Sequence, residues 1–429
     1  MLVAVVMLFV VGAMAALSID VVTLYTARSE AQLAADAAAL AGARVLANSG
    51  MTSDLAGTVM PLAQPLASTV ATQVARQNSV GGRNLAAAEV TVDFAGSATH
   101  PCSVVANPCL TVHVQRTDLP TFFARIWGRT TIAVGASATA EAYNPSGLAS
   151  GITAGTALPV APTCVKPWLL PNMDPSPTNT DKNIFDPVSG AINPASTLLG
   201  WVTPAAPGQY RLRTDCTPST CFASTAPQTW RYYPLANDAI NYPAPSAASI
   251  VCPGCTGFNA YQRSIAGCVQ TPVSCNQTMN IDQNADSNRD TETRFAVNGL
   301  THSTANQGDS VDVASPPSPP CQFLAGDDNP VVVSGTVPTG ADIMVSDSLV
   351  TVPVVNIDNT NSPPIPGFPA VQIIGFVQMF LNPAGQGTVS GRPHVEVINL
   401  VGCGTAGTTG QPILGNGASP VPVRLISAP

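Results

Sequence analysis

The chain opens with a long uncharged run, residues 1–19, in which almost every side chain is apolar. A helix rises about 1.5 Å per residue, so a helix over this run would extend about 28 Å, close to the hydrocarbon thickness of a bilayer. The sequence continues to about residue 48 without a proline and is rich in alanine, the strongest helix former. The pattern therefore predicts one helix of about 45 residues, with its first part in lipid and its second part outside.

The same run is also compatible with a cleaved signal peptide. Ala13, Met14 and Ala15 form an A-x-A pattern, which signal peptidase recognises after an apolar segment. A signal peptide usually begins with a positively charged region, however, and the apolar run here carries no charge and continues past Ala15. We therefore predict a retained transmembrane helix over residues 1–19, with cleavage after Ala15 as the alternative.

A second helix and three strands follow in the pattern up to residue 145. Apolar residues recur every four positions from Leu62 to Val74, and Asn78 ends the repeat, which predicts an amphipathic helix. Three runs rich in β-branched residues, separated by proline and glycine, predict the strands 88–94, 110–115 and 130–142. The aromatic segment TFFARIWG between the last two strands is short enough to form a helical turn. Residues 20–145 are thus expected to form a unit of helices and a small antiparallel sheet.

The rest of the chain divides by composition into two parts. Residues 146–320 are rich in Pro, Ser, Thr and Asn with little periodicity, so irregular connections are expected there. Residues 321–429 contain apolar runs bounded by turn residues, which predict a β-rich distal domain with strands at 331–333, 343–345, 350–357, 371–381 and 394–401. The fold class is therefore α+β, with the transmembrane helix and a long Ala-rich helix preceding the two sheets.

Small side chains gather on one side of the long helix after residue 20. Because small side chains let two helix backbones approach closely, this face is expected to pack against partner helices. The face consists of Ala27, Ala31, Ala34, Ala35, Ala38 and Ala41. A thin polar stripe runs beside it at multiples of four residues, formed by Arg28, Gln32, Asp36 and Arg44.

The order of residues in this helix is also distinctive. It reads Asp20, Leu24, Tyr25, Ala27, Arg28, Gln32 and then Ala34-Ala35-Asp36-Ala37-Ala38-Ala39-Leu40-Ala41-Gly42-Ala43. This run resembles the N-terminal motif of the TadE/TadG-like proteins of Flp pilus assembly. The positions to which the resemblance assigns a helix-packing role are Asp20, Tyr25, Arg28, Gln32, Ala35, Asp36, Ala38, Ala39, Leu40 and Gly42.

The resemblance implies a single-pass protein of the bacterial inner membrane that belongs to the tight-adherence secretion system. It further implies that the bulk of the chain is extracytoplasmic, that residues 20–145 form a pilin-like unit, and that the protein is a minor pilin or an assembly component. Its expected partners are the lipid bilayer and other pilus-assembly or pilin-like proteins. The alternative function is a secreted or surface-displayed adhesin-like binding module released by signal peptidase.

Charge excludes one class of partner. Charged residues make up only 10% of the chain, the net charge is −8, and the 17 basic residues do not cluster, so a nucleic-acid-binding surface is not expected. The acidic excess lies entirely after Cys275. Such a bias is typical of a solvated acidic surface.

All 11 cysteines lie at or beyond Cys102, as expected if the downstream part of the chain occupies an oxidising compartment. Two close pairs are predicted to form local disulfides, Cys102–Cys109 and Cys216–Cys221. The group Cys252, Cys255, Cys268 and Cys275 also admits a zinc site or a redox pair, but its spacing fits neither pattern well, and structural disulfides are the preferred interpretation.

Other candidate chemistry is weak in the sequence. Residues 402–407 match G-x-G-x-x-G, but no helix pattern or acidic residue follows them as a dinucleotide site requires. Residues 358–362 are better read as an Asx-rich turn than as a metal loop. The alternating oxygen ligands of residues 282–290 allow a weak calcium site but fit the EF-hand pattern poorly. The four histidines are scattered, so we expect no enzyme activity, no cofactor, no metal site and no small-molecule substrate.

Overall fold

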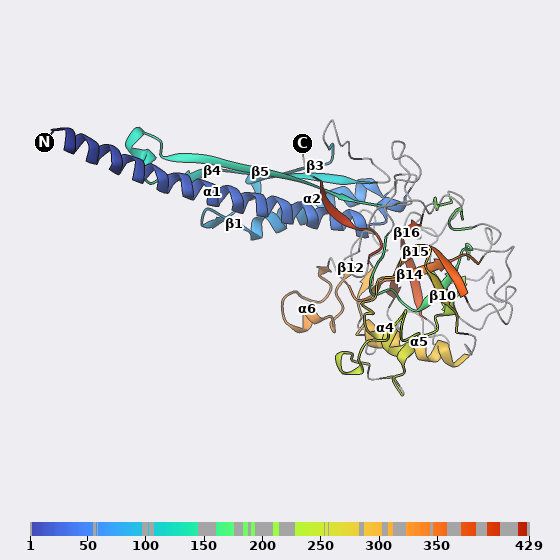
Figure 1. The fold of residues 1–429 in the computed structure, drawn as a ribbon. Coiled ribbons are helices and arrows are strands. Elements are labelled where there is room, and N and C mark those ends of the chain that lie inside the picture. The colour runs from blue at the N-terminus through green and yellow to red at the C-terminus, as the bar shows by residue number, and fades with distance from the viewer. Residues whose placement is uncertain are drawn as a thin grey trace.

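The computed structural model describes most of the helical and strand regions of the chain. The described residues are 2–54, 57, 59–96, 102, 107–144, 160–175, 183–187, 190–193, 209–213, 228–252, 254–255, 257–282, 287–302, 308–311, 323–343, 346–357, 370–382, 393–403 and 419–426. Two sheet-containing units make up this part of the molecule, and one long helix extends away from them (Figure 1).

Helix α1 (Leu2–Asn48) is a single uninterrupted helix, as the alanine-rich and proline-free sequence predicts. Its first part projects beyond the rest of the molecule, and its second part lies against it (Figure 1). After the short turn η1 (Met51–Ser53), helix α2 (Met60–Gln77) runs back along α1. Pro61 lies in the first turn of α2, where a missing backbone N–H costs little, whereas Pro65 lies inside the helix.

A four-stranded antiparallel sheet covers α1 in the order β17-β5-β4-β3. The predicted strands correspond to β3 (Val90–Asp93), β4 (Cys109–Pro120) and β5 (Thr131–Ala142). Side chains of β4 alternate between buried and exposed positions, so its apolar residues face the helices. Strand β17 (Val423–Ile426) returns from the C-terminus to pair with β5, which the sequence pattern did not predict. We call α1, α2 and these four strands the helix–sheet unit.

The second sheet has eight strands in the order β8-β7-β16-β15-β14-β6-β9, with β10 also paired to β15. Its long strands β14 (Leu349–Val355), β15 (Ala370–Asn382) and β16 (His394–Gly402) confirm three of the predicted strands. The shorter strands come from the region expected to be irregular: β6 (Trp168–Pro171), β7 (Gln209–Arg213), β8 (Gln228–Arg231), β9 (Tyr233–Pro234) and β10 (Thr278–Asn280). Strands from both sides of the expected boundary at residue 320 therefore share one sheet.

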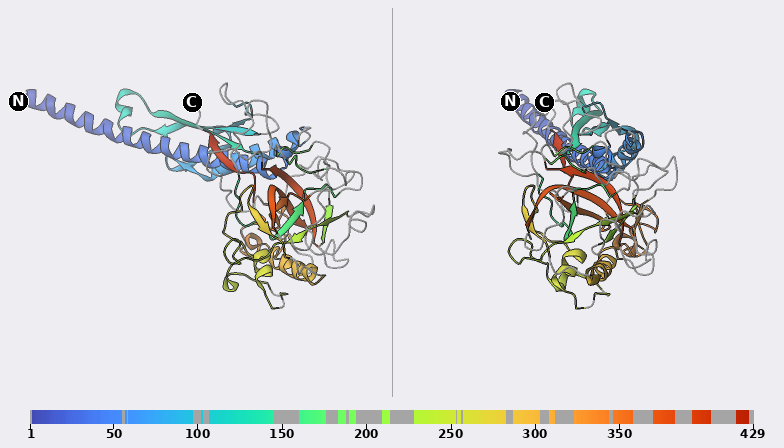
Figure 2. Two further views of the ribbon diagram at one scale, coloured as in Figure 1. Left: turned by 45° about the vertical axis from the view of Figure 1, so that its right-hand side comes forward. Right: turned by 90° about the vertical axis from the view of Figure 1, so that its right-hand side faces the viewer.

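Helices α4 (Ala260–Ala266) and α5 (Ser287–Leu300) cover one face of this sheet, and the helix–sheet unit lies on the other side (Figure 2). Side chains of the buried strands contribute to both faces: Val352 and Val354 pack toward α4 and α5, whereas Phe376 and Phe380 belong to the core shared with α1. We call the eight-stranded sheet with α4 and α5 the distal unit.

Small elements complete the described chain. They are the two-stranded hairpin β1 (Ser79–Val80) and β2 (Arg83–Asn84), the turns η2 (Ala87–Glu89), η3 (Ala124–Trp127) and η4 (Ala247–Ser249), and the three-stranded sheet β11 (Ser310–Val311), β12 (Phe323–Leu324) and β13 (Asp342–Ile343).

The predicted strand 331–333 is wrong, because this segment forms the helical turn α6 (Pro330–Val333). Asn329 caps the turn by accepting a hydrogen bond from the Val331 N–H at 3.0 Å, and Pro330 occupies the first helical position. Both residues favour a helix start, and they override the strand preference of three consecutive valines.

Buried polar groups join the two units. The Ser53 hydroxyl of η1 donates to the Leu400 carbonyl at 3.1 Å and accepts from the Leu400 N–H at 2.9 Å. Asn144, which follows β5, donates to the same carbonyl at 3.0 Å. Asn399 donates to the Ala47 carbonyl at the end of α1, at 2.6 Å. We call this cluster the polar joint, and it fixes the end of α1 to strand β16 because buried polar groups are costly when left unpaired.

Candidate functional site

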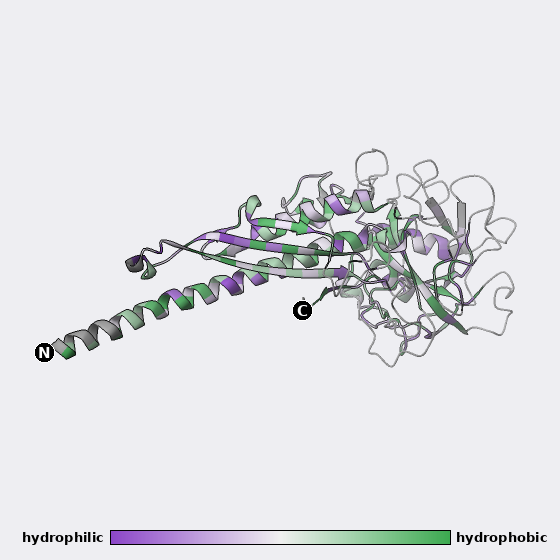
Figure 3. Ribbon diagram, turned by 90° about the horizontal axis from the view of Figure 1, so that it is seen from above, coloured by the Kyte–Doolittle hydropathy of each residue, from purple (hydrophilic) through white to green (hydrophobic). Residues whose placement is uncertain are grey.

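The apolar part of α1 is exposed where it projects from the molecule. Its described side chains toward the N-terminus are mostly exposed and hydrophobic, and the hydropathy colouring shows this part of the helix as apolar (Figure 3). Among the described residues, α1 is the helix that is long and apolar enough to cross a membrane. The largest of these exposed side chains are Val3, Met7, Val11, Met14, Leu17 and Ile19.

Asp20 is the first charged residue of α1 and is buried, although Val21 and Val22 directly after it are again exposed. Its carboxylate accepts three backbone hydrogen bonds, from the N–H groups of Phe122 at 2.8 Å, Phe123 at 3.0 Å and Ala124 at 2.7 Å. These residues lie in the connection between β4 and β5, residues 121–130, which we call the hairpin tip. Asp20 thus caps η3 from a distant part of the chain, since a carboxylate is a strong acceptor for the free N–H groups at the start of a helical turn.

The alanine face of α1 packs inside the protein itself. Ala27, Ala31, Ala34, Ala35 and Ala38 are all buried, whereas Ala41 is partly exposed. The five buried alanines and Ala39 belong to the core that α1 shares with α2 and the four-stranded sheet. The expectation that small side chains allow close packing therefore applies to this chain's own elements, and its extension to partner helices stays a prediction.

Gly42 marks a close approach between α1, α2 and the sheet. A Cβ atom at this position would lie 2.7 Å from Leu110 Cδ1 on β4 and 3.2 Å from the Cβ of Ala71 on α2. Leu110 and Ala71 are themselves completely buried. A residue larger than glycine would therefore need the sheet or α2 to shift.

The polar positions of the motif lie toward the outside of α1. Tyr25 is 72% exposed, and Arg28 is also exposed. Gln32 donates to Asp36 Oδ1 at 2.8 Å and to the Ser137 carbonyl of β5 at 3.2 Å. Leu40 is partly buried against the core. The motif therefore has inner positions, such as Ala35 and Ala38, that hold the unit together. Its outer positions, such as Tyr25 and Arg28, have exposed side chains.

The predicted disulfide Cys102–Cys109 is present. Cys216 and Cys221 lie outside the described residues. The four cysteines considered as a zinc or redox site are instead used in three bridges: Cys252–Cys255, Cys164–Cys268 and Cys275–Cys403. Two of these bridges join segments 104 and 128 residues apart, which explains why local spacing did not identify them.

The calcium and nucleotide patterns can be placed only in part. Asp282 forms an ion pair with Arg289 at 2.6 Å, and α5 begins at Ser287, so the second half of the acidic pattern is helical rather than a loop. Residues 283–286, 358–362 and 404–407 lie outside the described residues.

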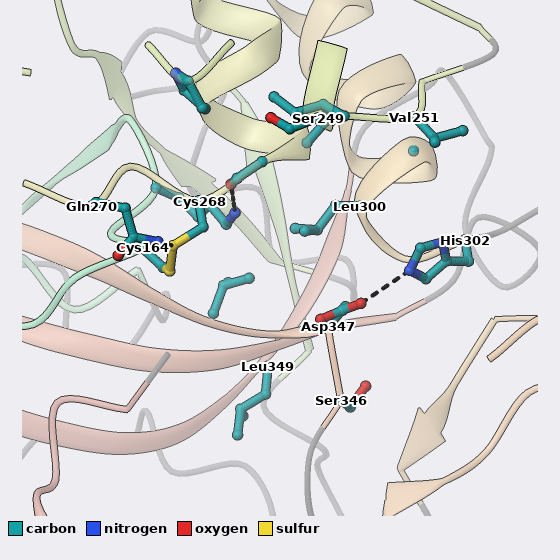
Figure 4. A pocket seen from close by; sticks show the side chains of 17 residues that line it. Cys164, Ser249, Val251, Cys268, Gln270, Leu300, His302, Ser346, Asp347 and Leu349 are labelled. Carbon is teal, nitrogen blue, oxygen red and sulfur yellow. Dashed lines mark hydrogen bonds and ion pairs between the residues drawn. A yellow bond between two sulfur atoms is a disulfide. The ribbon is translucent and has the colours of Figure 1, made fainter. Parts of the chain in front are cut away.

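A cavity of about 490 Å³ lies in the distal unit, between α4, α5 and the start of β14 (Figure 4). Its wall contains the Cys164–Cys268 disulfide and apolar side chains such as Leu300 and Leu349. His302 pairs with Asp347 at 3.0 Å, and this pairing raises the pKa of His302. The polar groups named here bond to one another rather than converging on the cavity, and they do not define a reaction.

Lys166 is the buried cation of this cavity. Its ammonium group donates to the carbonyls of Ile265 at 2.7 Å and Gly267 at 2.8 Å. Burial lowers the pKa of Lys166 to about 7, because removal from water disfavours the charged form more than the nearby Asp347 favours it. Nothing in the sequence marks this residue, since a single lysine carries no pattern.

Comparison with known proteins finds one match. Residues 1–45 match the family model described as putative Flp pilus-assembly TadE/G-like, which confirms the resemblance for this segment. No curated protein and no solved structure matches the chain. The match includes Asp20 and the alanine face, so it contains both the exposed apolar helix and the residues that fix it to the folded units.

Proposed function

We propose that the chain is a membrane-anchored structural component of a bacterial Flp/Tad pilus-assembly system. It spans the inner membrane once through the apolar part of α1, carries its bulk on the extracytoplasmic side, and acts by association rather than by catalysis. The observation that carries the proposal is the continuity of α1: the segment that matches the Tad family model is apolar and exposed at one end and deeply packed at the other.

The orientation is supported by the cysteines. The described disulfides all lie in or beyond the four-stranded sheet, and none involves α1. Disulfides persist in oxidising compartments such as the bacterial periplasm. This distribution favours an arrangement in which the folded units lie outside the cytoplasm.

The packing of α1 defines which surfaces are available to a partner. The alanine face is occupied by the protein's own core, so partner contacts come from the exposed apolar segment and from the outer positions of the motif. Tyr25 is one such outer position, with its side chain 72% exposed. Within a bilayer, close helix contacts are made by small residues, and Gly12 has open space around it.

The proposal predicts that a charge in the apolar segment releases the protein from the membrane. Val11→Arg places a cation near the middle of residues 1–19, where insertion costs about 3 kcal/mol. Leu33→Arg is the matched control, since Leu33 is 65% exposed on the same helix and Val11 is 66% exposed. Carbonate extraction of membranes should release a much larger fraction of the Val11→Arg protein than of the wild type or the control.

The same variants test the pilus role in a strain that lacks the chain. Leu33→Arg should restore pilus formation, and Val11→Arg should not. If Val11→Arg resists extraction and restores pili as well as the control does, the anchoring segment has been assigned wrongly. N-terminal sequencing separates the alternative, because a soluble mature chain that begins at Ala16 would indicate a secreted binding module.

A further inference from the structure

The hairpin tip exposes an aromatic and basic surface. Phe122 is 62% exposed, and Arg125 and Arg129 are also exposed. The tip lies at the end of the β4–β5 hairpin that faces the N-terminus of α1, far from the distal unit (Figures 1 and 2). Phe122 is linked to Asp20 beside the exposed apolar side chains of α1, and adjoining exposed apolar side chains mark a contact surface more clearly than a single one does.

The three hydrogen bonds to Asp20 fix where this surface lies along α1. They hold the tip beside residue 20, where the uncharged run of residues 1–19 ends. The tip is therefore held at the height of the first charged residue of α1. In a membrane-anchored chain, this height is the boundary between the acyl chains and the headgroups.

The chemistry of the tip suits that boundary. Phenylalanine is among the side chains that surface-lying segments bury at the boundary between headgroups and acyl chains, and arginines near the surface are attracted to lipid phosphates. A bare carboxylate so close to lipid is unfavourable, but the carboxylate of Asp20 is satisfied by three N–H groups of the tip itself. Asp20 and the tip thus form one structure whose charged group is already paired.

On these grounds we infer that the hairpin tip is a second membrane contact, which rests on the outer leaflet of the bilayer that α1 crosses. Phe122 enters the acyl boundary, and Arg125 and Arg129 bind lipid phosphates. The inference rests on the proposed anchoring by α1 and adds a function for residues outside the segment that matches the Tad family model. Two contacts fix the rotation of α1 about its own axis, which one helix alone leaves free.

The test uses the full chain reconstituted into vesicles of phosphatidylethanolamine and phosphatidylglycerol. A photo-crosslinking phenylalanine analogue replaces Phe122, Val11 or Ile240 in three separate proteins. Ile240 is the control for exposure alone, since it is 87% exposed in the distal unit. We expect lipid adducts at positions 11 and 122 and none at position 240.

The possible outcomes separate the two proposals. Adducts at position 11 without adducts at position 122 overturn the inference and leave the anchor intact. Absence of adducts at both positions overturns the anchor and the inference together. Equal adducts at positions 122 and 240 overturn the inference, because labelling then follows exposure and not contact with lipid.

A second variant tests the role of Asp20 in placing the tip. Asp20→Ala removes the acceptor of all three hydrogen bonds, so the ratio of docked to undocked tip should fall by about fivefold, the factor that corresponds to the loss of a typical capping residue, and the lipid adduct at position 122 should fall with it. The adduct at position 11 should remain. An unchanged adduct at position 122 would show that Asp20 does not place the tip at the membrane.

Discussion

The two units both bury a core, but they build it from different side chains. The helix–sheet unit is built from small side chains, with alanines every three or four residues on α1 and every four residues on α2. The distal unit buries the largest side chains of the described chain, among them Trp168, Trp230 and Tyr232, and carries disulfides between distant segments. Small side chains give close contact between regular elements, whereas large ones fill the space between irregular segments.

This difference indicates which kind of substitution should destabilise each unit. In the helix–sheet unit, an added side chain has no space, because backbones approach each other closely. In the distal unit, many segments have little regular structure of their own, so covalent links contribute more to its stability. The following predictions separate these two sources of stability.

The largest effect is expected from removal of the Cys275–Cys403 disulfide. This bridge closes a segment of 128 residues, so replacing both cysteines with alanine should lower the free energy of unfolding by about 2–4 kcal/mol. Removal of Cys252–Cys255, whose cysteines are only 3 residues apart, is the control and should cost much less. Hydrogen exchange followed segment by segment should show the loss in the distal unit. Equal losses for both bridges would mean that the length of the closed segment does not set the stability of this unit.

A smaller effect is expected from overpacking the helix–sheet unit. Ala38 is completely buried, so Ala38→Leu should lower the free energy of unfolding by about 1–3 kcal/mol and should impair pilus assembly. Ala37→Leu is the matched control, because the adjacent Ala37 is partly exposed. Urea unfolding in detergent, followed by helix content, measures the difference. If the two variants unfold alike, the alanine face is not the tight contact described above.

The smallest effect concerns Lys166 and pH. Its pKa of about 7 in the folded protein lies below the usual 10.5, so the unfolded chain binds more protons above pH 7 and stability rises with pH. Between pH 7 and 8 this group should add about 1 kcal/mol. Lys166→Met should remove the rise, as measured by urea unfolding at the two pH values.

Comparing the variant with the wild type separates the effect of Lys166 on the pH dependence of stability from that of His302. The raised pKa of His302 acts in the opposite direction, because its contribution is lost as pH rises through the folded value. A wild-type protein whose stability changes between pH 7 and 8 no differently from that of Lys166→Met would contradict the assignment.

The sequence predicts the parts of the fold that depend on local pattern. Helix α1, helix α2 and the strands β3, β4, β5, β14, β15 and β16 follow from periodicity and turn residues, because each element carries its own signal. The short strands β6 to β10 have no such signal, since their form depends on pairing with other strands, and β6 and β7 pair with strands more than a hundred residues away. The return of β17 to β5 is invisible in the sequence for the same reason.

The candidate site is divided in the same way. Asp20 stands out in the sequence as a member of the motif, but its three partners do not. They bond through the backbone N–H, which does not depend on the side chain, so the residue type does not reveal them. The one available signal is the aromatic composition of the segment that contains Phe122. The alanine face is visible as a pattern, but whether it meets a partner or the protein's own sheet is decided only by tertiary structure.

The polar joint between Ser53, Asn144, Asn399 and Leu400 has a mechanical consequence. It fastens the end of α1 to a central strand of the distal unit, so the helix and this unit turn together. With the proposed anchoring, a small tilt of α1 in the bilayer would produce a larger sideways displacement of the distal unit, in proportion to its distance along the helix. The molecule would then act as a lever that pivots at the membrane surface.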